Sequence, residues 1–145
     1  MRLPVDIRLR RILLADPDEA ARTSLMRMLA RLQLGDVRET TTSTETYDIL
    51  QRAEVPIDLL ITELTLPPHD GFALIRSIRG NPNLACTAIP IVAMTAAADG
   101  GVLSRLQKLD VPSLLVKPVR SAALFSRITL ALRSTPQKRP VPRDT

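Results

Sequence analysis

Short apolar segments alternate with amphipathic segments through most of the chain. The apolar segments are nearly continuous, as expected of strands buried on both faces of a parallel sheet. We expect strands at residues 12–15, 37–41, 57–64, 88–95 and 111–117. The intervening segments repeat apolar residues at spacings of three and four, which is typical of helices that cover such a sheet. We expect helices at residues 18–34, 43–55, 72–79, 99–109 and 121–133.

Polar residues and glycines at the segment boundaries support these limits. Asp18 is an expected N-cap of the first helix, and Ser43 or Thr44 is expected at the start of the second. Gly35 and Gly80 are expected to end the first and third helices.

Five strands that each precede a helix indicate an α/β fold. Right-handed crossovers restrict such a chain to a doubly wound, flavodoxin-like parallel sheet, most simply with strand order 2-1-3-4-5. In this order, a site forms at the carboxyl ends of strands 1, 3, 4 and 5. We therefore predict one domain at residues 12–133, preceded by a basic extension at 1–11 and followed by a disordered basic tail at 134–145.

The net charge of +5 raises the question of nucleic-acid or membrane binding. Residues 12–133 contain 13 basic and 13 acidic side chains, so the excess lies in the two ends, which we expect to be mobile. Only 2% of the residues are aromatic, and no helix-turn-helix follows the domain. Nucleic-acid binding is therefore a weak interpretation.

Cysteine content and hydropathy indicate the cellular compartment. Cys86 has no partner for a disulfide and is expected to fill the core. The N-terminal residues lack the apolar run of a signal peptide, and no segment approaches a membrane span of roughly 18 residues. We expect a cytoplasmic protein that does not contact a membrane.

Acidic residues follow two of the predicted strands. Asp16 and Asp18 flank Pro17 directly after the first strand, and Glu63 stands near the end of the third. The turn that follows Glu63 has the sequence Pro-Pro-His-Asp-Gly over 67–71. Strand ends of this kind meet at one edge of the sheet.

A hydroxyl and an ammonium group end the remaining two strands. Thr95 ends the fourth, and Lys117 ends the fifth and is followed by Pro118. These segments, in this order, resemble the response-regulator receiver domain family over about residues 11–133. The resemblance implies an acidic cluster that holds Mg²⁺, an aspartate that accepts a phosphoryl group, Thr95 and Lys117 positions that neutralise the phosphate, and a cis bond before Pro118.

The sequence departs from the family at three positions. Glu63 fills the phospho-acceptor position, and its extra methylene displaces the oxygen by about 1 Å, a misplacement that can cost roughly 10²-fold in rate. Pro17 replaces the second acidic residue, and Asp18 lies one position too far along. Leu114 replaces the aromatic residue that often reports phosphorylation in the family. We therefore expect neither phosphorylation nor a bound cofactor, Mg²⁺ included.

The individual residues have simpler interpretations too. Glu63 is either a partial imitation of a phosphate, paired with Lys117 and Thr95, or one member of a structural ion pair with Lys117 and Asp16. Thr95 is equally well explained as the cap of the next loop. His69 is expected to be a solvated loop residue.

The leading hypothesis is a stand-alone atypical receiver of a bacterial two-component or phosphorelay system. We expect it to act by protein–protein contact and not to be an enzyme. The partner is a histidine kinase, a phosphotransfer protein, an output protein, or a second copy bound through the face of the fourth helix, fifth strand and fifth helix. This face offers Val102, Leu106, Leu114, Val119 and Leu124. The alternatives are a conventional phosphoryl-accepting regulator and a nucleic-acid accessory protein that uses its basic ends.

Overall fold

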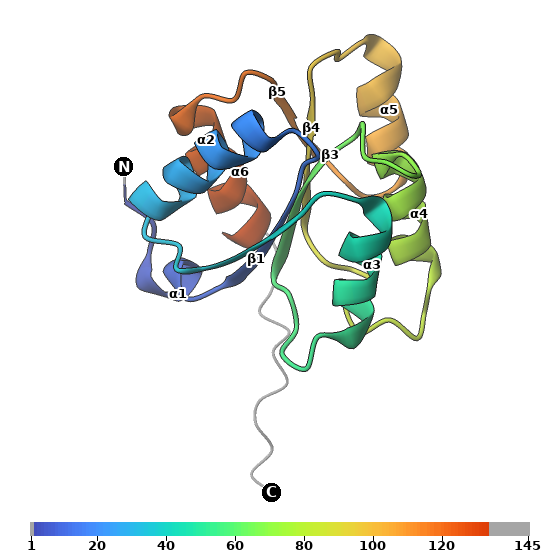
Figure 1. Cartoon of the computed structure of the whole chain (residues 1–145), viewed down its shortest axis with the longest axis horizontal. Helices are drawn as coiled ribbons and strands as arrows, with labels where there is room; N and C mark the ends of the chain where they lie inside the picture. Colours follow the sequence, from blue (N-terminus) through green and yellow to red (C-terminus); the bar gives the residue numbers. More distant parts are fainter. Residues whose placement is uncertain (1, 134–145) are drawn as a thin grey trace, which may run out of the picture.

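One five-stranded parallel sheet forms the centre of the molecule. The computed structural model describes residues 2–133. The strands lie in the order β2-β1-β3-β4-β5, which confirms the predicted topology (Figure 1). They are β1 Arg11–Ala15, β2 Asp36–Thr40, β3 Leu59–Glu63, β4 Ile91–Thr95 and β5 Ser113–Val116. The helices are α1 Val5–Arg8, α2 Glu19–Arg31, α3 Ser43–Arg52, α4 Gly71–Gly80, α5 Gly100–Lys108 and α6 Ser121–Arg133.

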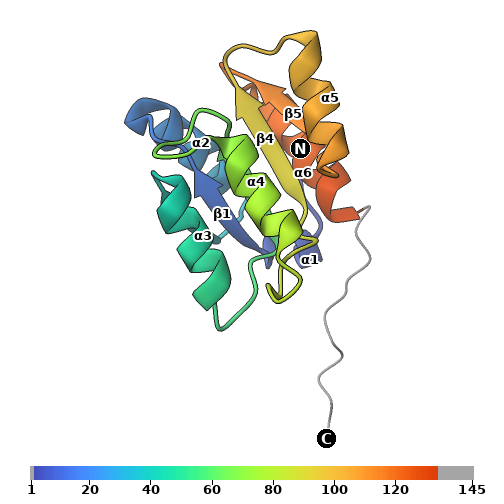
Figure 2. The same ribbon diagram turned by 90° about the vertical axis from the view of Figure 1, so that its right-hand side faces the viewer.

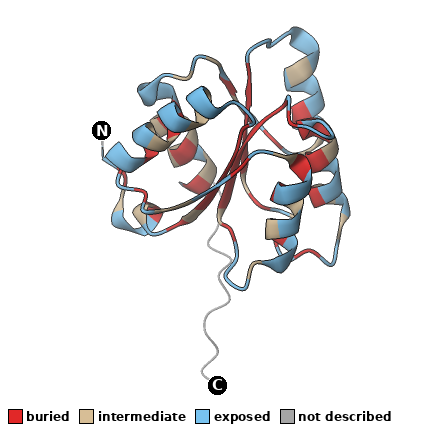
Figure 3. Ribbon diagram, viewed as in Figure 1, coloured by how far each residue is buried: buried red, intermediate tan, exposed pale blue. Residues whose placement is uncertain are grey.

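Helices cover both faces of the sheet. Helices α1, α2 and α6 lie on one face, and α3, α4 and α5 lie on the other, which Figure 2 views from the front. Alternate strand residues enter the two cores, since side chains alternate across a strand. Leu13 and Leu60 pack toward α3–α5, whereas Leu14 and Ile61 pack toward α2 and α6. Figure 3 shows the buried residues concentrated in the sheet and on the inner helix faces.

The predicted helix boundaries are close to the observed ones, with one correction at a helix start and one at a helix end. Asp18 caps α2 as predicted, but Thr42 caps α3 in place of Ser43 or Thr44, because the Thr42 hydroxyl accepts a hydrogen bond from a backbone N–H of the first turn. Gly35 does not end α2. Gln33 adopts the left-handed conformation, with φ of 64°, after the helix has ended at Arg31.

Two strands begin later than expected because a proline directly precedes each of them. Pro90 and Pro112 have no N–H to donate to a neighbouring strand, so β4 begins at Ile91 and β5 at Ser113. A series of turns joins α4 to β4, and it is closed by backbone hydrogen bonds such as that from Ile89 N to the Cys86 carbonyl. The thiol of Cys86 is buried near the Leu50 carbonyl, in agreement with a core role.

The N-terminal segment is folded onto the domain, which corrects the expectation of a mobile extension. Leu3 and Ile7 are 1% and 2% exposed and belong to the core shared by α2 and α6. Arg10 is also buried, and the Arg8 guanidinium donates a hydrogen bond to Gln33. The predicted tail at 134–145 lies outside the described residues. Within residues 2–133, none of the helices has the length and apolar character needed to cross a membrane.

Candidate functional site

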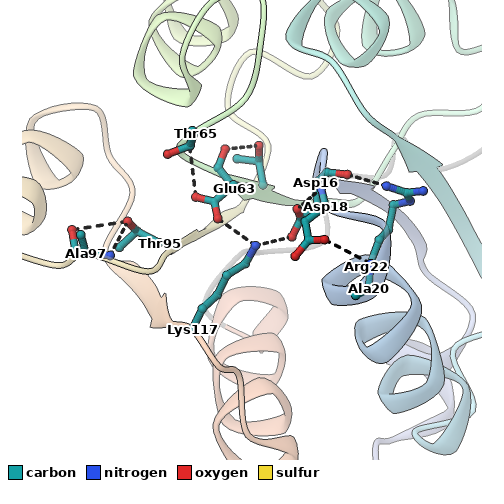
Figure 4. A network of polar contacts seen from close by, with 10 residues as sticks. Asp16, Asp18, Ala20, Arg22, Glu63, Thr65, Thr95, Ala97 and Lys117 are labelled. Atoms are coloured by element: carbon teal, nitrogen blue, oxygen red, sulfur yellow. Dashed lines mark hydrogen bonds and ion pairs between the residues drawn. The ribbon is translucent and has the colours of Figure 1, made fainter.

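Three charged side chains meet at the carboxyl end of the sheet. Asp16 follows β1, Glu63 is the last residue of β3, and Lys117 follows β5. The Lys117 Nζ atom lies 2.6 Å from Asp16 Oδ2 and 2.8 Å from Glu63 Oε1 (Figure 4). The structure thus confirms the predicted contact between Lys117 and Glu63, and it shows that one ammonium group bridges two carboxylates.

Both carboxylate oxygens of Glu63 have a partner. While Oε1 accepts from Lys117, Oε2 accepts a 3.0 Å hydrogen bond from the backbone N–H of Thr65. Only 8% of the Glu63 side chain is exposed. The carboxylate is therefore fixed between the loop that follows β3 and the ammonium group that follows β5.

Asp16 is fully buried, and its loop is fixed by several contacts. Oδ1 accepts a 2.9 Å hydrogen bond from Asp18 N, and the Asp16 backbone N–H donates to the Thr40 carbonyl. The Asp16 carbonyl accepts a 2.8 Å bond from Arg22 Nη1, while Arg22 Nε pairs with Glu39. Sequence reasoning missed Arg22. Its only signal was a cation in the first turns of the helix that follows the acidic loop.

Asp18 contributes less than the sequence suggested. Its carboxylate accepts a hydrogen bond from Ala20 N at 3.2 Å and so caps α2. Lys117 forms ion pairs with Asp16 and Glu63, and none with Asp18 within the described structure. The acidic pocket predicted from Asp16 and Asp18 is instead formed by Asp16 and Glu63.

The Thr95 hydroxyl serves the next loop. It accepts a 3.1 Å hydrogen bond from Ala97 N, and it donates a 3.4 Å hydrogen bond to the Ala97 carbonyl. Its bonded partner is Ala97 and not Glu63, so the loop-capping interpretation is the one observed. The Thr95 carbonyl also accepts from Lys117 N at 2.8 Å, which positions the start of the lysine side chain.

A family comparison agrees with this geometry. The model of the response regulator receiver domain matches residues 12–129. The chain belongs to the response regulator receiver domain family. It is 34% identical over 124 residues to the transcriptional regulatory protein GltR of Pseudomonas aeruginosa, and the aligned region covers 86% of this chain and 49% of that protein. It is 35% identical over 123 residues to the transcriptional regulatory protein AfsQ1 of Streptomyces coelicolor, and the aligned region covers 84% of this chain and 51% of AfsQ1.

Solved structures share the same fold. A putative response regulator from Chloroflexus aurantiacus has a TM-score of 0.77 at 23% identity, covering 86% of this chain and 98% of that chain. The chain spans about half the length of GltR and AfsQ1.

The Mg²⁺ ion implied by the family resemblance does not fit the donors of this receiver. Pro17 offers no side-chain oxygen, and Asp18 is engaged as a helix cap. One oxygen of Asp16 is bound to Lys117 and the other to a backbone N–H. Among residues 2–133, no three His, Cys, Asp or Glu side chains are grouped closely enough to hold a metal ion.

Lys117 is charged in this environment. Burial alone would lower the pKa of Lys117, because it penalises the charged form. The hydrogen bonds and negative charges of Asp16 and Glu63 together outweigh burial, and the pKa of Lys117 is raised above its ordinary value. The ammonium group is therefore protonated at neutral pH.

The remaining predicted positions are accounted for structurally. The Lys117–Pro118 peptide bond is cis, as predicted, and Leu114 packs against the core on the α3–α5 side. His69 is exposed, in agreement with a loop role, and its backbone N–H donates to Ser43.

The face of α5, β5 and α6 corresponds to the predicted contact face, and of the five apolar residues predicted there Val102, Leu114 and Val119 are half-buried. Leu106 and Leu124 are fully buried and cannot meet a partner. The exposed large apolar side chains of this face are Leu103, Val116 and Leu130, at 41%, 54% and 54%.

Proposed function

We propose that this receiver signals by protein–protein contact and is not phosphorylated. The observation that carries the proposal is the fixed Glu63 carboxylate, whose two oxygens bind Lys117 and the Thr65 N–H. Glu63 stands where the family resemblance places the phosphoryl-accepting aspartate. The protein is thus an atypical receiver, or pseudo-receiver.

The chemistry of phosphoryl transfer supports the proposal. An attacking carboxylate oxygen must be free and correctly placed, and a metal ion must neutralise the incoming phosphoryl group. Here Lys117 already holds the oxygen that would attack, and the donor set does not fit Mg²⁺. We accordingly expect no catalysed self-phosphorylation and no enzymatic activity.

The proposed partner is a protein of a two-component or phosphorelay pathway, in the cytoplasm. Leu103, Val116 and Leu130 supply apolar contact area on the α5–β5–α6 face. A kinase, a phosphotransfer protein, an output protein or a second copy would bury these side chains. GltR and AfsQ1 are named transcriptional regulatory proteins, and an output of that kind fits a receiver that works by contact.

Labelling with a phosphodonor tests the proposal. The purified chain is incubated with acetyl phosphate and Mg²⁺, and the intact mass is measured for wild type, Glu63→Gln and the double variant Pro17→Asp/Glu63→Asp. We expect no phosphoryl adduct on wild type. The double variant restores a shorter acceptor and a second carboxylate. We expect it to gain a phosphoryl adduct that hydroxylamine removes.

A stoichiometric adduct on wild type that disappears in Glu63→Gln would establish a conventional phosphoryl-accepting receiver instead. An adduct that persists in Glu63→Gln lies on another residue, and it would likewise contradict the proposal that this receiver is not phosphorylated.

A further inference from the structure

A cavity of about 370 Å³ lies at the amino end of the sheet, opposite the cluster of Asp16, Glu63 and Lys117. The first residues of β4 and β5, Ile91 and Ser113, line it together with residues near the carboxyl ends of α4 and α6. Cavities of this size hold small organic molecules. We infer that this cavity is a binding site for a small organic carboxylate that carries an apolar group.

Arg127 of α6 places an uncommitted positive charge in the wall of the cavity. The residue is half-buried, and within residues 2–133 its guanidinium forms no hydrogen bond, ion pair or stacking contact. By contrast, Arg11, Arg22 and Arg52 each pair with a carboxylate of the chain. A planar guanidinium matches the two oxygens of a carboxylate. Arg127 is therefore available to bind an anion from outside the chain.

Arg79 of α4 supplies a second guanidinium to the cavity, and backbone carbonyls hold it in place. Nε donates to the Leu109 carbonyl at 2.9 Å, Nη1 to the Thr87 carbonyl at 2.9 Å, and Nη2 to the Asp110 carbonyl at 3.2 Å. Because a guanidinium has five N–H groups, one donor on each terminal nitrogen is left for a ligand. A cation that is already fixed loses little conformational freedom when it binds.

The rest of the wall suits an anion with an apolar body. Ser113 is buried, and its hydroxyl has no hydrogen-bond partner in the described part of the chain, so it can donate to a carboxylate. Ile89 and Leu130 add apolar surface. Among the described lining residues, Asp110 alone is acidic, so two positive charges face one negative charge. The wall therefore favours an anion over a cation.

Charge also favours a separate molecule as the occupant. Residues 134–145 carry Lys138, Arg139 and Arg143 against the single acidic side chain of Asp144, so their net charge matches the two arginines of the wall poorly. The cavity lies at the other end of the sheet from Glu63, and the inference does not depend on whether this receiver is phosphorylated.

Titration of the isotope-labelled full chain with phenylacetate tests the inference. Two-dimensional NMR spectra follow the backbone amides of Ile89, Ile91 and Ser113 in the cavity wall. We expect saturable shifts of these amides with a dissociation constant of about 1 mM, which suits a molecule of this size. The neutral analogue phenylacetamide should bind at least about tenfold more weakly, because it lacks the charge that the arginines recognise.

Two variants and a matched control assign the binding to these side chains. Arg127→Gln removes the uncommitted charge and should weaken phenylacetate binding by about tenfold. Ser113→Ala removes a neutral donor and should weaken it by about two- to fivefold. Arg133→Gln is the control, because Arg133 is an exposed arginine of the same helix that does not line the cavity. This control should bind phenylacetate as wild type does.

Three results would each overturn the inference. The first is the absence of saturable shifts in the cavity wall at about ten times the expected dissociation constant. The second is equal affinity of wild type for phenylacetate and phenylacetamide, which would mean that the arginines do not recognise the charge. The third is an equal effect of Arg127→Gln and Arg133→Gln. The comparison of the two probes uses wild type alone, so it decides the matter even where a variant fails to fold.

Discussion

Removing Lys117 and removing the charge of Glu63 should lower the free energy of unfolding by unequal amounts. Lys117→Met leaves both Asp16 and Glu63 without a cation, whereas Glu63→Gln leaves Lys117 paired with Asp16 at 2.6 Å. At an effective dielectric constant of about 20, two charges 2.8 Å apart attract by about 6 kcal/mol before desolvation is subtracted. Most of this attraction is offset by desolvation, so the penalty comes mainly from the stranded charge.

Lys117→Met should therefore lower the free energy of unfolding more than Glu63→Gln does. Lys117→Met should lower it by about 3–5 kcal/mol, as is typical when one partner of a buried pair is removed. Glu63→Gln should lower it by about 1–2 kcal/mol, because the amide oxygen can still accept from the Thr65 N–H. In the double variant, one fewer carboxylate is stranded, and the total loss should fall short of the sum by about 1–2 kcal/mol.

Urea unfolding at neutral pH, followed by circular dichroism, measures all four members of this cycle. The exposed pair between Arg52 and Asp48 provides a matched control, since its side chains are 80% and 51% exposed and its coupling should be near zero. The reasoning is refuted if the coupling between Lys117 and Glu63 equals that of the exposed pair. It is equally refuted if Glu63→Gln costs as much stability as Lys117→Met.

Three further predictions concern pH, the N-terminal segment and a crowded glycine. The folded state holds the Lys117 proton more tightly than the unfolded state does. The stability difference between wild type and Lys117→Met should therefore be complete below the unfolded pKa of about 10.4 and should shrink as pH rises through the higher folded pKa. Urea unfolding midpoints measured against pH test this expectation, and a stability difference that grows above the folded pKa would contradict it. Ile7→Ala should lower the free energy of unfolding by about 2–4 kcal/mol, whereas Leu9→Ala, at a 72% exposed side chain, should change it by less than about 0.5 kcal/mol; equal effects in urea would mean that α1 does not pack on the domain. Gly71→Ala places a Cβ 2.7 Å from a backbone oxygen of β3 and should destabilise by about 1–3 kcal/mol. Gly80→Ala meets nothing within 4 Å, so it should be neutral or slightly stabilising in the same assay.

The order of elements could be predicted from the sequence because the signal is strong in each segment. A run such as Ile12-Leu13-Leu14 is apolar on both faces, which suits a central parallel strand. The strand order then follows from crossover handedness and not from any single residue. The same logic placed Asp16, Glu63 and Lys117 at one edge of the sheet, so their meeting was predictable without coordinates.

Local competition between side chains was less predictable. Asp18 could have joined the acidic cluster or capped α2, and the sequence cannot weigh a hydrogen bond to Ala20 N against a contact across the site. Thr42 was overlooked because several hydroxyl residues stand together at the start of α3. The burial of Leu3 and Ile7 was masked by neighbouring arginines, since a short helix of four residues carries too little periodicity to reveal its apolar side.

The contacts of Thr95 favour a structural ion pair over an imitation of the phosphorylated state. A phosphate offers three acceptor oxygens, enough to engage a hydroxyl and an ammonium group together. Glu63 has two oxygens, and both are occupied, one by Lys117 and the other by Thr65 N. The Thr95 hydroxyl accordingly bonds to Ala97 in the next loop. A carboxylate that does not engage the threonine cannot transmit its charge to that loop by this route, so the face of α5, β5 and α6 should keep one arrangement whether or not Glu63 is charged.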